Sequence, residues 1–230
     1  MNRQILRRLT LAAVFVAFSN SAMAASVVWD VDVNPSNGFG GQTDAWSNSD
    51  QGAFYAEWNA FDSLSDGTPN VGSSGLASQS VTETTGGAFL TGGGNIYSFA
   101  VATDFDVLFG TAGAPVANAT RNVALRVGII GTQIDAASVL LGGLAPTLSS
   151  NTYVEEITGG FGGFEYEWIF VWEDVADQSN YQIDFNAASS SMSLDQLALY
   201  GSSASAVPVP AAVWLFGSGL GLLGWMRRKA

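Results

Sequence analysis

Apolar and polar residues alternate in several short stretches of this chain, and that pattern narrows the choice of fold more than any other. In the clearest stretch, aromatic side chains occupy every second position: Phe164, Tyr166, Trp168, Phe170 and Trp172. A β-strand points successive side chains to opposite faces of its sheet, so a period of two residues predicts a strand with one buried face. We therefore expect these five aromatic side chains to lie in a hydrophobic core.

The same alternation recurs along the chain between glycine-rich segments that predict turns, such as 91–94 and 159–163. It indicates strands over 29–33, 54–61, 95–102, 105–109, 123–129, 134–141, 181–185 and 192–200. No window of twelve or more residues between 25 and 200 has the 3.6-residue period of a helix. The sequence thus predicts an all-β fold, a single antiparallel β-sandwich over residues 25–200 of the jelly-roll or concanavalin-like kind.

Histidine and cysteine are absent from all 230 residues. Their absence excludes Ser-His-Asp and Cys-His catalytic systems, His or Cys zinc sites and disulfide bonds. Glu165 and Glu167 share one strand face, as the two acids of a retaining glycosidase do. The third acid of the laminarinase-like pattern is replaced by Phe170. We therefore expect a solvated strand face there and no enzyme activity, with a glycoside hydrolase as the less favoured alternative.

Charge is unevenly distributed along the chain. Residues 25–206 hold all twenty acidic residues but only two basic ones, Arg121 and Arg126, so this part carries a net charge of −18. Such a field repels phosphate groups, and we expect no nucleic-acid partner. A calcium ion would relieve part of the repulsion, and oxygen ligands for it are offered by Asp30, Asp32, Asp104 and Asp106. Apart from this calcium hypothesis, no cofactor is expected.

Residues 1–24 have the three parts of a secretory signal peptide. A basic segment that ends at Arg8 precedes the ten apolar residues 9–18, and Ala22 and Ala24 supply the small side chains that signal peptidase requires. Ten helical residues span only about 15 Å, half of a hydrocarbon layer of roughly 30 Å, which argues against a membrane anchor here. We expect cleavage after Ala24, so that the mature chain begins at Ala25.

The C-terminal residues predict a membrane segment. A polar linker, 201–206, leads into Val207 and then the proline motif Pro208, Val209 and Pro210. The sixteen residues 211–226 that follow are uncharged, and together with residues 207–210 they are long enough to span a bilayer. The next three residues, Arg227, Arg228 and Lys229, form a basic cluster that predicts a cytoplasmic C-terminus.

Segment 207–230 resembles the PEP-CTERM protein-sorting domain of Gram-negative bacteria, also called the ice-binding protein C-terminal domain. The run Pro-Ala-Ala-Val-Trp-Leu-Phe-Gly-Ser-Gly follows the proline motif as in a common variant of that domain, with Val209 in place of the glutamate of Pro-Glu-Pro. The resemblance implies recognition by an exosortase, a membrane-embedded processing enzyme. It also implies that the body is released or transferred to the cell surface or to an exopolysaccharide matrix.

The body between the two ends is similar, at short landmarks, to uncharacterised bacterial β-sandwich proteins that carry the same tail. These landmarks are 57–59, 69–72, 159–163 and 191–195. The similarity supports the fold and implies no activity.

Two functions therefore stay open. We favour an exported, non-catalytic surface or extracellular-matrix protein associated with exopolysaccharide. The alternative is a carbohydrate-binding, lectin-like module, because exposed aromatic side chains stack on sugar rings. Trp46 is the candidate contact, since its surroundings lack alternation and predict a loop. A flat exposed aromatic patch would favour binding, whereas two carboxylates facing each other across a cleft would favour catalysis.

Overall fold

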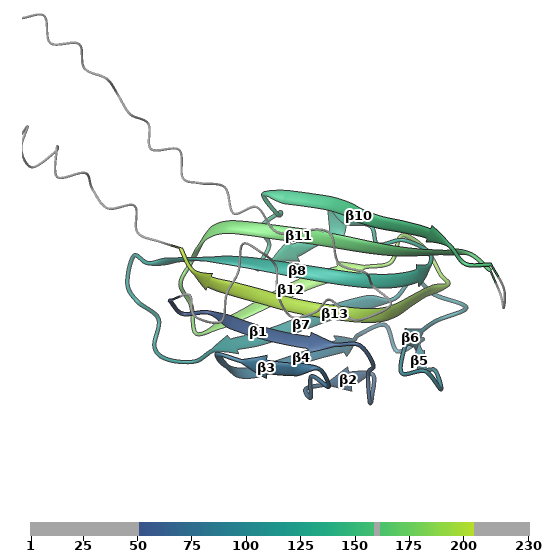
Figure 1. The fold of residues 1–230 in the computed structure, drawn as a ribbon, viewed down its shortest axis with the longest axis horizontal. Coiled ribbons are helices and arrows are strands. Elements are labelled where there is room, and N and C mark those ends of the chain that lie inside the picture. Colours follow the sequence, from purple (N-terminus) through teal and green to yellow (C-terminus); the bar gives the residue numbers. More distant parts are fainter. Residues whose placement is uncertain (1–50, 159–161, 205–230) are drawn as a thin grey trace, which may run out of the picture.

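The computed structural model describes residues 51–158 and 162–204, which form two antiparallel β-sheets packed together (Figure 1). The larger sheet contains β1 (Phe54–Trp58), β3 (Gly72–Ser74), β5 (Phe89–Leu90), β6 (Ile96–Tyr97), β8 (Thr120–Gly131), β10 (Leu148–Glu156), β11 (Phe164–Ala176) and β13 (Met192–Ser203). The smaller sheet contains β2 (Ser65–Asp66), β4 (Leu76–Glu83), β7 (Asp104–Thr111), β9 (Leu140–Leu141) and β12 (Asn180–Asn186). The predicted all-β class is confirmed for the described residues.

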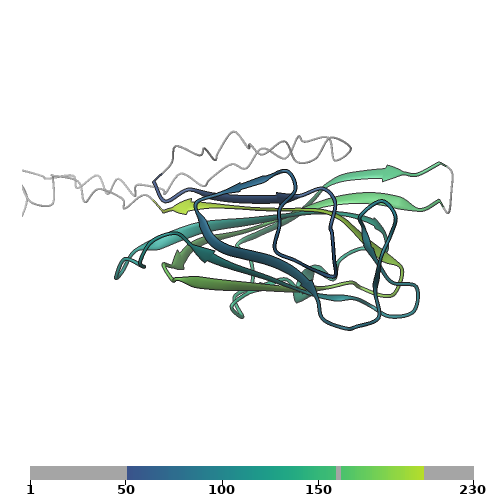
Figure 2. The same cartoon turned by 90° about the horizontal axis from the view of Figure 1, so that it is seen from below.

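The strand order shows how distant parts of the chain meet. The larger sheet runs β10-β11-β8-β13-β1-β3, and the β5–β6 hairpin joins it by pairing β6 with the first residues of β13. The smaller sheet runs β2-β4-β7-β12-β9. Figure 2 shows the two sheets as layers. From β7 to β10 and again from β11 to β13, consecutive strands lie in opposite sheets. The chain therefore crosses from one sheet to the other at each of these steps.

The core lies between the two sheets, where the inward residues of each strand meet. Phe170 and Trp172 of β11 are buried there, as the alternation predicts, and Tyr166 and Trp168 are half-buried against the same cluster. The prediction is wrong for Phe164, which is 43% exposed. With thirteen residues, β11 is longer than the strands that face it, and Figure 2 shows the ends of β10 and β11 reaching past the smaller sheet.

Several element boundaries differ from the sequence-based expectation. The expected strand 134–141 contains instead an isolated bridge at Ile134, one 3₁₀ turn, η2 (Ala136–Ser138), and the short β9. The expected strand 95–102 shortens to β6. At the C-terminal end, β13 continues through Ser203, so the expected linker 201–206 begins inside a strand. Both β4 and β10 lie outside the predicted strands.

The outer face of the larger sheet also buries side chains. A second cluster there contains Tyr55, Ala124, Ile169, Val171, Ala198 and Tyr200. Among them lie the buried charged residues Glu57, Arg126 and Glu167. Half-buried positions on this face lie at both ends of the central strands: Ile130 and Glu165 near the start of β13, and Asn122 and Ser202 near its end.

The described chain starts and ends at the same end of the sandwich. Phe54, at the start of β1, pairs with Gly201 near the end of β13, and the backbone N–H of Ser203 donates to the carbonyl of Gln51 at 2.9 Å. The β5–β6 hairpin lies at the opposite end, beside the first residues of β13 (Figure 1). Within residues 51–158 and 162–204, no helix has the length and apolar character needed to cross a membrane.

Candidate functional site

A concave pocket beside the β5–β6 hairpin is the candidate site, and we call it the aromatic pocket. It has a volume of about 490 Å³ and is lined by Phe89, Thr91, Tyr97, Phe99, Ile130, Gly131, Gly162, Ser191 and Ser193. Phe99 is 64% exposed and Phe89 is 42% exposed, far more than aromatic side chains in the core of this protein. Large apolar side chains that remain exposed together at a hollow mark a binding surface.

The three rings of the pocket form one cluster. Tyr97 meets Phe99 edge to face with ring centroids 4.6 Å apart. Phe89 stacks on Phe99 at 5.6 Å and meets Tyr97 edge to face at 5.7 Å. These separations lie in the range of favourable aromatic pairs, so each ring fixes the position of the other two.

Local hydrogen bonds explain why the hairpin holds this shape. Its turn is closed by the N–H of Thr91, which donates to the carbonyl of Asn95 at 2.9 Å, and by the N–H of Asn95, which donates to the Thr91 hydroxyl at 3.0 Å. Gly94 has a φ of 87°, and a Cβ there would lie 2.8 Å from the Cβ of Ala60. Glycine is therefore required for the turn to pack against the segment after β1.

A second set of bonds fixes Phe99. The carbonyl of the preceding residue, Ser98, accepts from the N–H of Ser191 at 2.9 Å, and the Ser98 hydroxyl accepts from the N–H of Val101 at 3.2 Å. Ser98 itself is buried. The exposed ring thus stands on an anchored backbone.

Strand register places the pocket at one end of a row of residues on the outer face of the larger sheet. The directly paired residues form one row over six strands, in the order Phe89, Tyr97, Ser193, Ile130, Glu165 and Glu155. Directly paired residues of antiparallel strands point to the same face, and neighbouring strands lie about 4.8 Å apart. The row therefore joins an aromatic end to a carboxylate end.

Carboxylates gather beside this row. Asp195 lies at a β-bulge of β13, where the register with β8 shifts between Leu194 and Gln196. Its Oδ1 accepts a hydrogen bond from Asn95 Nδ2 at 2.6 Å. Burial raises the pKa of Asp195 above its usual value, and the bond from Asn95 opposes that rise. Burial also raises the pKa of Glu165, with further contributions from the negative charges of Asp195 and Glu155.

Glu167, the other member of the predicted acid pair, has a different environment. Its Oε1 accepts from Arg126 Nε at 3.0 Å and forms an ion pair with Nη2, and neither side chain is exposed to solvent. Burial raises the pKa of Glu167, although the charge and hydrogen bonds of Arg126 act in the opposite direction. Glu165 and Glu167 share a strand face as predicted, but Glu167 serves as the partner of a buried guanidinium.

The predicted calcium ligands Asp104 and Asp106 lie on the smaller sheet. They line a hollow of about 340 Å³ on its outer face, together with Thr84, Phe105, Ser138, Asp184, Phe185 and Asn186. Asp106 is paired in register with Asp184. Partial burial raises the pKa of Asp106, and the hydrogen bond to Asp184 and the charges of Asp184 and Asp104 raise it further. Within the described ranges, no group of three or more acidic, histidine or cysteine side chains is arranged to hold a metal ion.

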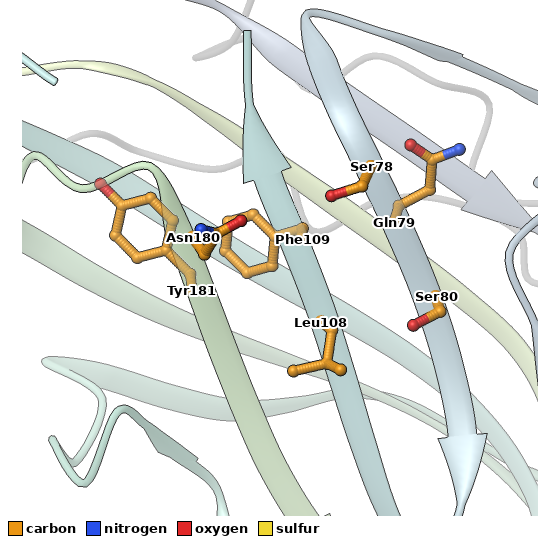
Figure 3. Close-up of a pocket in the computed structure, with 7 residues that line it drawn as sticks. All are labelled: Ser78, Gln79, Ser80, Leu108, Phe109, Asn180 and Tyr181. Carbon is orange, nitrogen blue, oxygen red and sulfur yellow. The ribbon is translucent and has the colours of Figure 1, made fainter. Parts of the chain in front are cut away.

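A third hollow, of about 390 Å³, crosses the outer face of the smaller sheet (Figure 3). Its lining residues come from three strands: Ser78, Gln79 and Ser80 of β4, Leu108 and Phe109 of β7, and Asn180 and Tyr181 of β12. Gly110 lies between Ser78 and Asn180 in register, and a Cβ there would lie 2.8 Å from Ser78 Oγ and 3.0 Å from Asn180 Oδ1, so glycine lets these two side chains come close together. The lining has no carboxylate or basic group, so it offers few features for recognition.

The sequence did not single out Phe89, Tyr97 or Phe99 as site residues. The remaining predicted site residues lie outside the described residues: Ala22, Ala24 and Ala25 at the signal cleavage site, Asp30 and Asp32 of the calcium hypothesis, Trp46, and Pro208, Val209, Pro210, Arg227, Arg228 and Lys229 of the sorting segment. A scan of protein-family models finds none that matches this chain, and a search of curated proteins also finds no match.

Proposed function

We propose that this chain is an exported, non-catalytic protein of the cell surface or extracellular matrix of a Gram-negative bacterium. In this proposal signal peptidase removes residues 1–24, and residues 207–226 hold the precursor in the inner membrane. An exosortase then processes the C-terminal segment, and the body associates with envelope or matrix polysaccharide. The observation that carries the proposal is the pairing of a signal peptide with a PEP-CTERM-like tail around one acidic all-β body.

The burial of Glu167 in the body supports a non-catalytic role. Glu167, which would be one of two catalytic acids, is buried against Arg126. A retaining glycosidase needs both carboxyl groups at the substrate. The alternation of strands between two antiparallel sheets also supports the finer part of the proposal, a sandwich of the jelly-roll or concanavalin-like kind.

Intact-mass and terminal-peptide analysis of the protein from its native host tests the sorting proposal. We expect a mature chain that begins at Ala25 and lacks residues 211–230. Replacing Pro208, Val209 and Pro210 with alanine is expected to leave the tail attached, whereas the control Ser205→Ala, just outside the motif, is expected to be processed normally. Mature surface material that retains Arg227, Arg228 and Lys229 would overturn the exosortase step.

Carbohydrate binding is the second candidate function, and the aromatic pocket is the observation that favours it. The pocket is an exposed cluster of rings next to carboxylates and hydroxyl groups. The residues that line it are not the contact that the sequence suggested, Trp46, which lies outside the described residues. Binding and surface retention are compatible, since a matrix protein requires a contact with its polysaccharide.

A further inference from the structure

We infer that the aromatic pocket, with Glu165 and Asp195 beside it, is a binding site for a neutral oligosaccharide chain. The inference deepens the proposed function, on which it rests, because it assigns the polysaccharide contact to residues that the sequence did not indicate. It draws on the exposed rings, the pocket volume, the strand register and the placement of the carboxylates.

The aromatic end of the row suits the apolar face of a sugar ring. A pyranose presents C–H groups on one face and hydroxyl groups around its edge. The negative face of an aromatic ring attracts such C–H groups, and the cluster leaves Phe99 and Phe89 open to solvent. Because the three rings hold one another in place, little side-chain freedom is lost on binding.

The polar end of the row suits hydroxyl groups. Carboxylate oxygens accept hydrogen bonds from hydroxyls, and charged acceptors form stronger bonds than neutral ones. Glu165 lies two strands away from Ser193 in the row. Asp195 lies on the same strand as Ser193, β13, two residues further along the chain. The Asn95 amide bonds to Asp195 and so orients that carboxyl group.

The length of the row argues for an extended chain. From Tyr97 to Glu165 the row crosses three strand spacings, about 14 Å in total. A compact organic cation, which aromatic rings and carboxylates also attract, cannot contact both ends at once. An oligosaccharide can lie along the row, with its ring faces on Phe99 and its hydroxyls on the carboxylates. An acidic glycan is disfavoured, because Glu155, Glu165 and Asp195 would repel it.

Titration calorimetry of the purified full-length protein tests the inference. The probes are neutral hexasaccharides of glucose, mannose, galactose and N-acetylglucosamine, with a galacturonic acid hexamer and spermidine as charged comparisons. We expect at least one neutral hexamer to bind, with an affinity that changes little between 0.1 M and 1 M sodium chloride, since no ion pair is screened. We expect no binding of the acidic hexamer.

Two variants locate the contact. Phe99→Ala is expected to raise the Kd of the neutral hexamer about tenfold, the size of effect that loss of one stacking ring produces. The control Leu108→Ala changes an apolar residue that is 44% exposed on the other sheet, and it is expected to leave the Kd unchanged. Both side chains are exposed, so both variants are expected to stay folded at the temperature of the titration, and Phe99→Ala is expected to lose only the ring contacts with Phe89 and Tyr97.

Several results would overturn the inference. These are an absence of binding across the neutral panel, tighter binding of spermidine or of the acidic hexamer, or an unchanged Kd in Phe99→Ala. The terminal-peptide analysis is independent of these titrations. A protein that is sorted as proposed but binds no neutral hexamer would refute only the site, and one that binds but keeps its tail would refute only the sorting.

Discussion

The buried ion pair of Arg126 and Glu167 makes stability sensitive to a single charge. Glu167→Gln removes the negative charge but keeps the shape, so the buried Arg126 loses its ion pair with Glu167. Breaking a buried pair in this way costs about 3–5 kcal/mol of unfolding free energy, and we expect a loss of that size in urea unfolding. Glu156→Gln, the same change at an exposed position of β10, is the control and is expected to stay within about 0.5 kcal/mol of wild type. Equal unfolding free energies of the two variants would show that the ion pair does not stabilise the folded chain.

The raised pKa of Asp106 predicts that stability depends on pH and that loss of this carboxylate stabilises the fold at neutral pH. This pKa is higher in the folded chain than the unfolded value of about 3.9. The folded state therefore binds more protons between the two values, and stability falls as the pH rises through the folded pKa. We expect Asp106→Asn to raise the melting temperature at pH 7, because it removes a partly buried charge and its repulsion from Asp184 and Asp104, and to have no such effect below the unfolded pKa.

Glu173→Gln provides the control for this pH series, because it removes one negative charge from β11 of the larger sheet, away from Asp106 and Asp184. A gain at pH 7 that is equal in the two variants would mean that net charge alone is responsible. A gain from Asp106→Asn that persisted unchanged at low pH would exclude the titration of this carboxyl as its cause.

Sequence periodicity predicted the buried residues well but could not predict the site. Phe170 and Trp172 follow from alternation, because burial of one strand face is a local property. Phe89 and Tyr97 belong to two-residue strands, which are too short to show a period. Ser193 lies nearly a hundred residues after Tyr97 in the sequence, and it reaches the same site only because β13 pairs with β6. Spacing within the sequence holds no signal for such a contact.

At the level of elements, β11 provides a direct test of where the core ends. Trp172 is buried, and its Nε1 donates to the carbonyl of Leu144 at 2.9 Å, whereas Phe164, the first residue of the strand, is 43% exposed. Trp172→Ala is expected to cost about 3–5 kcal/mol of unfolding free energy. Phe164→Ala is expected to cost about 0.5 kcal/mol or less. Denaturant unfolding of both variants measures the difference, and similar losses would show that the core reaches the first residue of β11.

The two long strands that the sequence did not predict have a common character. β4 has the sequence LASQSVTE and β10 the sequence LSSNTYVEE, both rich in serine and threonine, and neither alternates clearly. β10 is an edge strand with no buried residue, so its partner β11 defines it more than its own side chains do. Strand formation here depends on pairing, which single-sequence patterns do not record.

For the whole molecule, charge is the dominant feature. A net charge of −18 over residues 25–206 leaves most carboxylates without a basic partner. Raising sodium chloride from 0.1 M to 1 M shortens the Debye length from about 10 Å to about 3 Å, so we expect the melting temperature to rise.

The calcium hypothesis, with Asp30, Asp32, Asp104 and Asp106 as ligands, predicts a larger rise in melting temperature with millimolar calcium than with sodium chloride at equal ionic strength. Equal rises would leave screening as the explanation and remove the calcium site.

The place where the described residues end decides which way the molecule faces when it is tethered. Strand β13 ends at Ser203, beside Gln51, and begins next to β6. The ten residue steps from Ser193 to Ser203 cover about 33 Å. For a chain attached through its C-terminal tail, the sandwich is therefore a rigid spacer, with the attachment at one pole and Phe89, Tyr97 and Phe99 at the other. The rings would project outward from the supporting surface by the length of the sheet, where a polymer that passes above that surface meets them first.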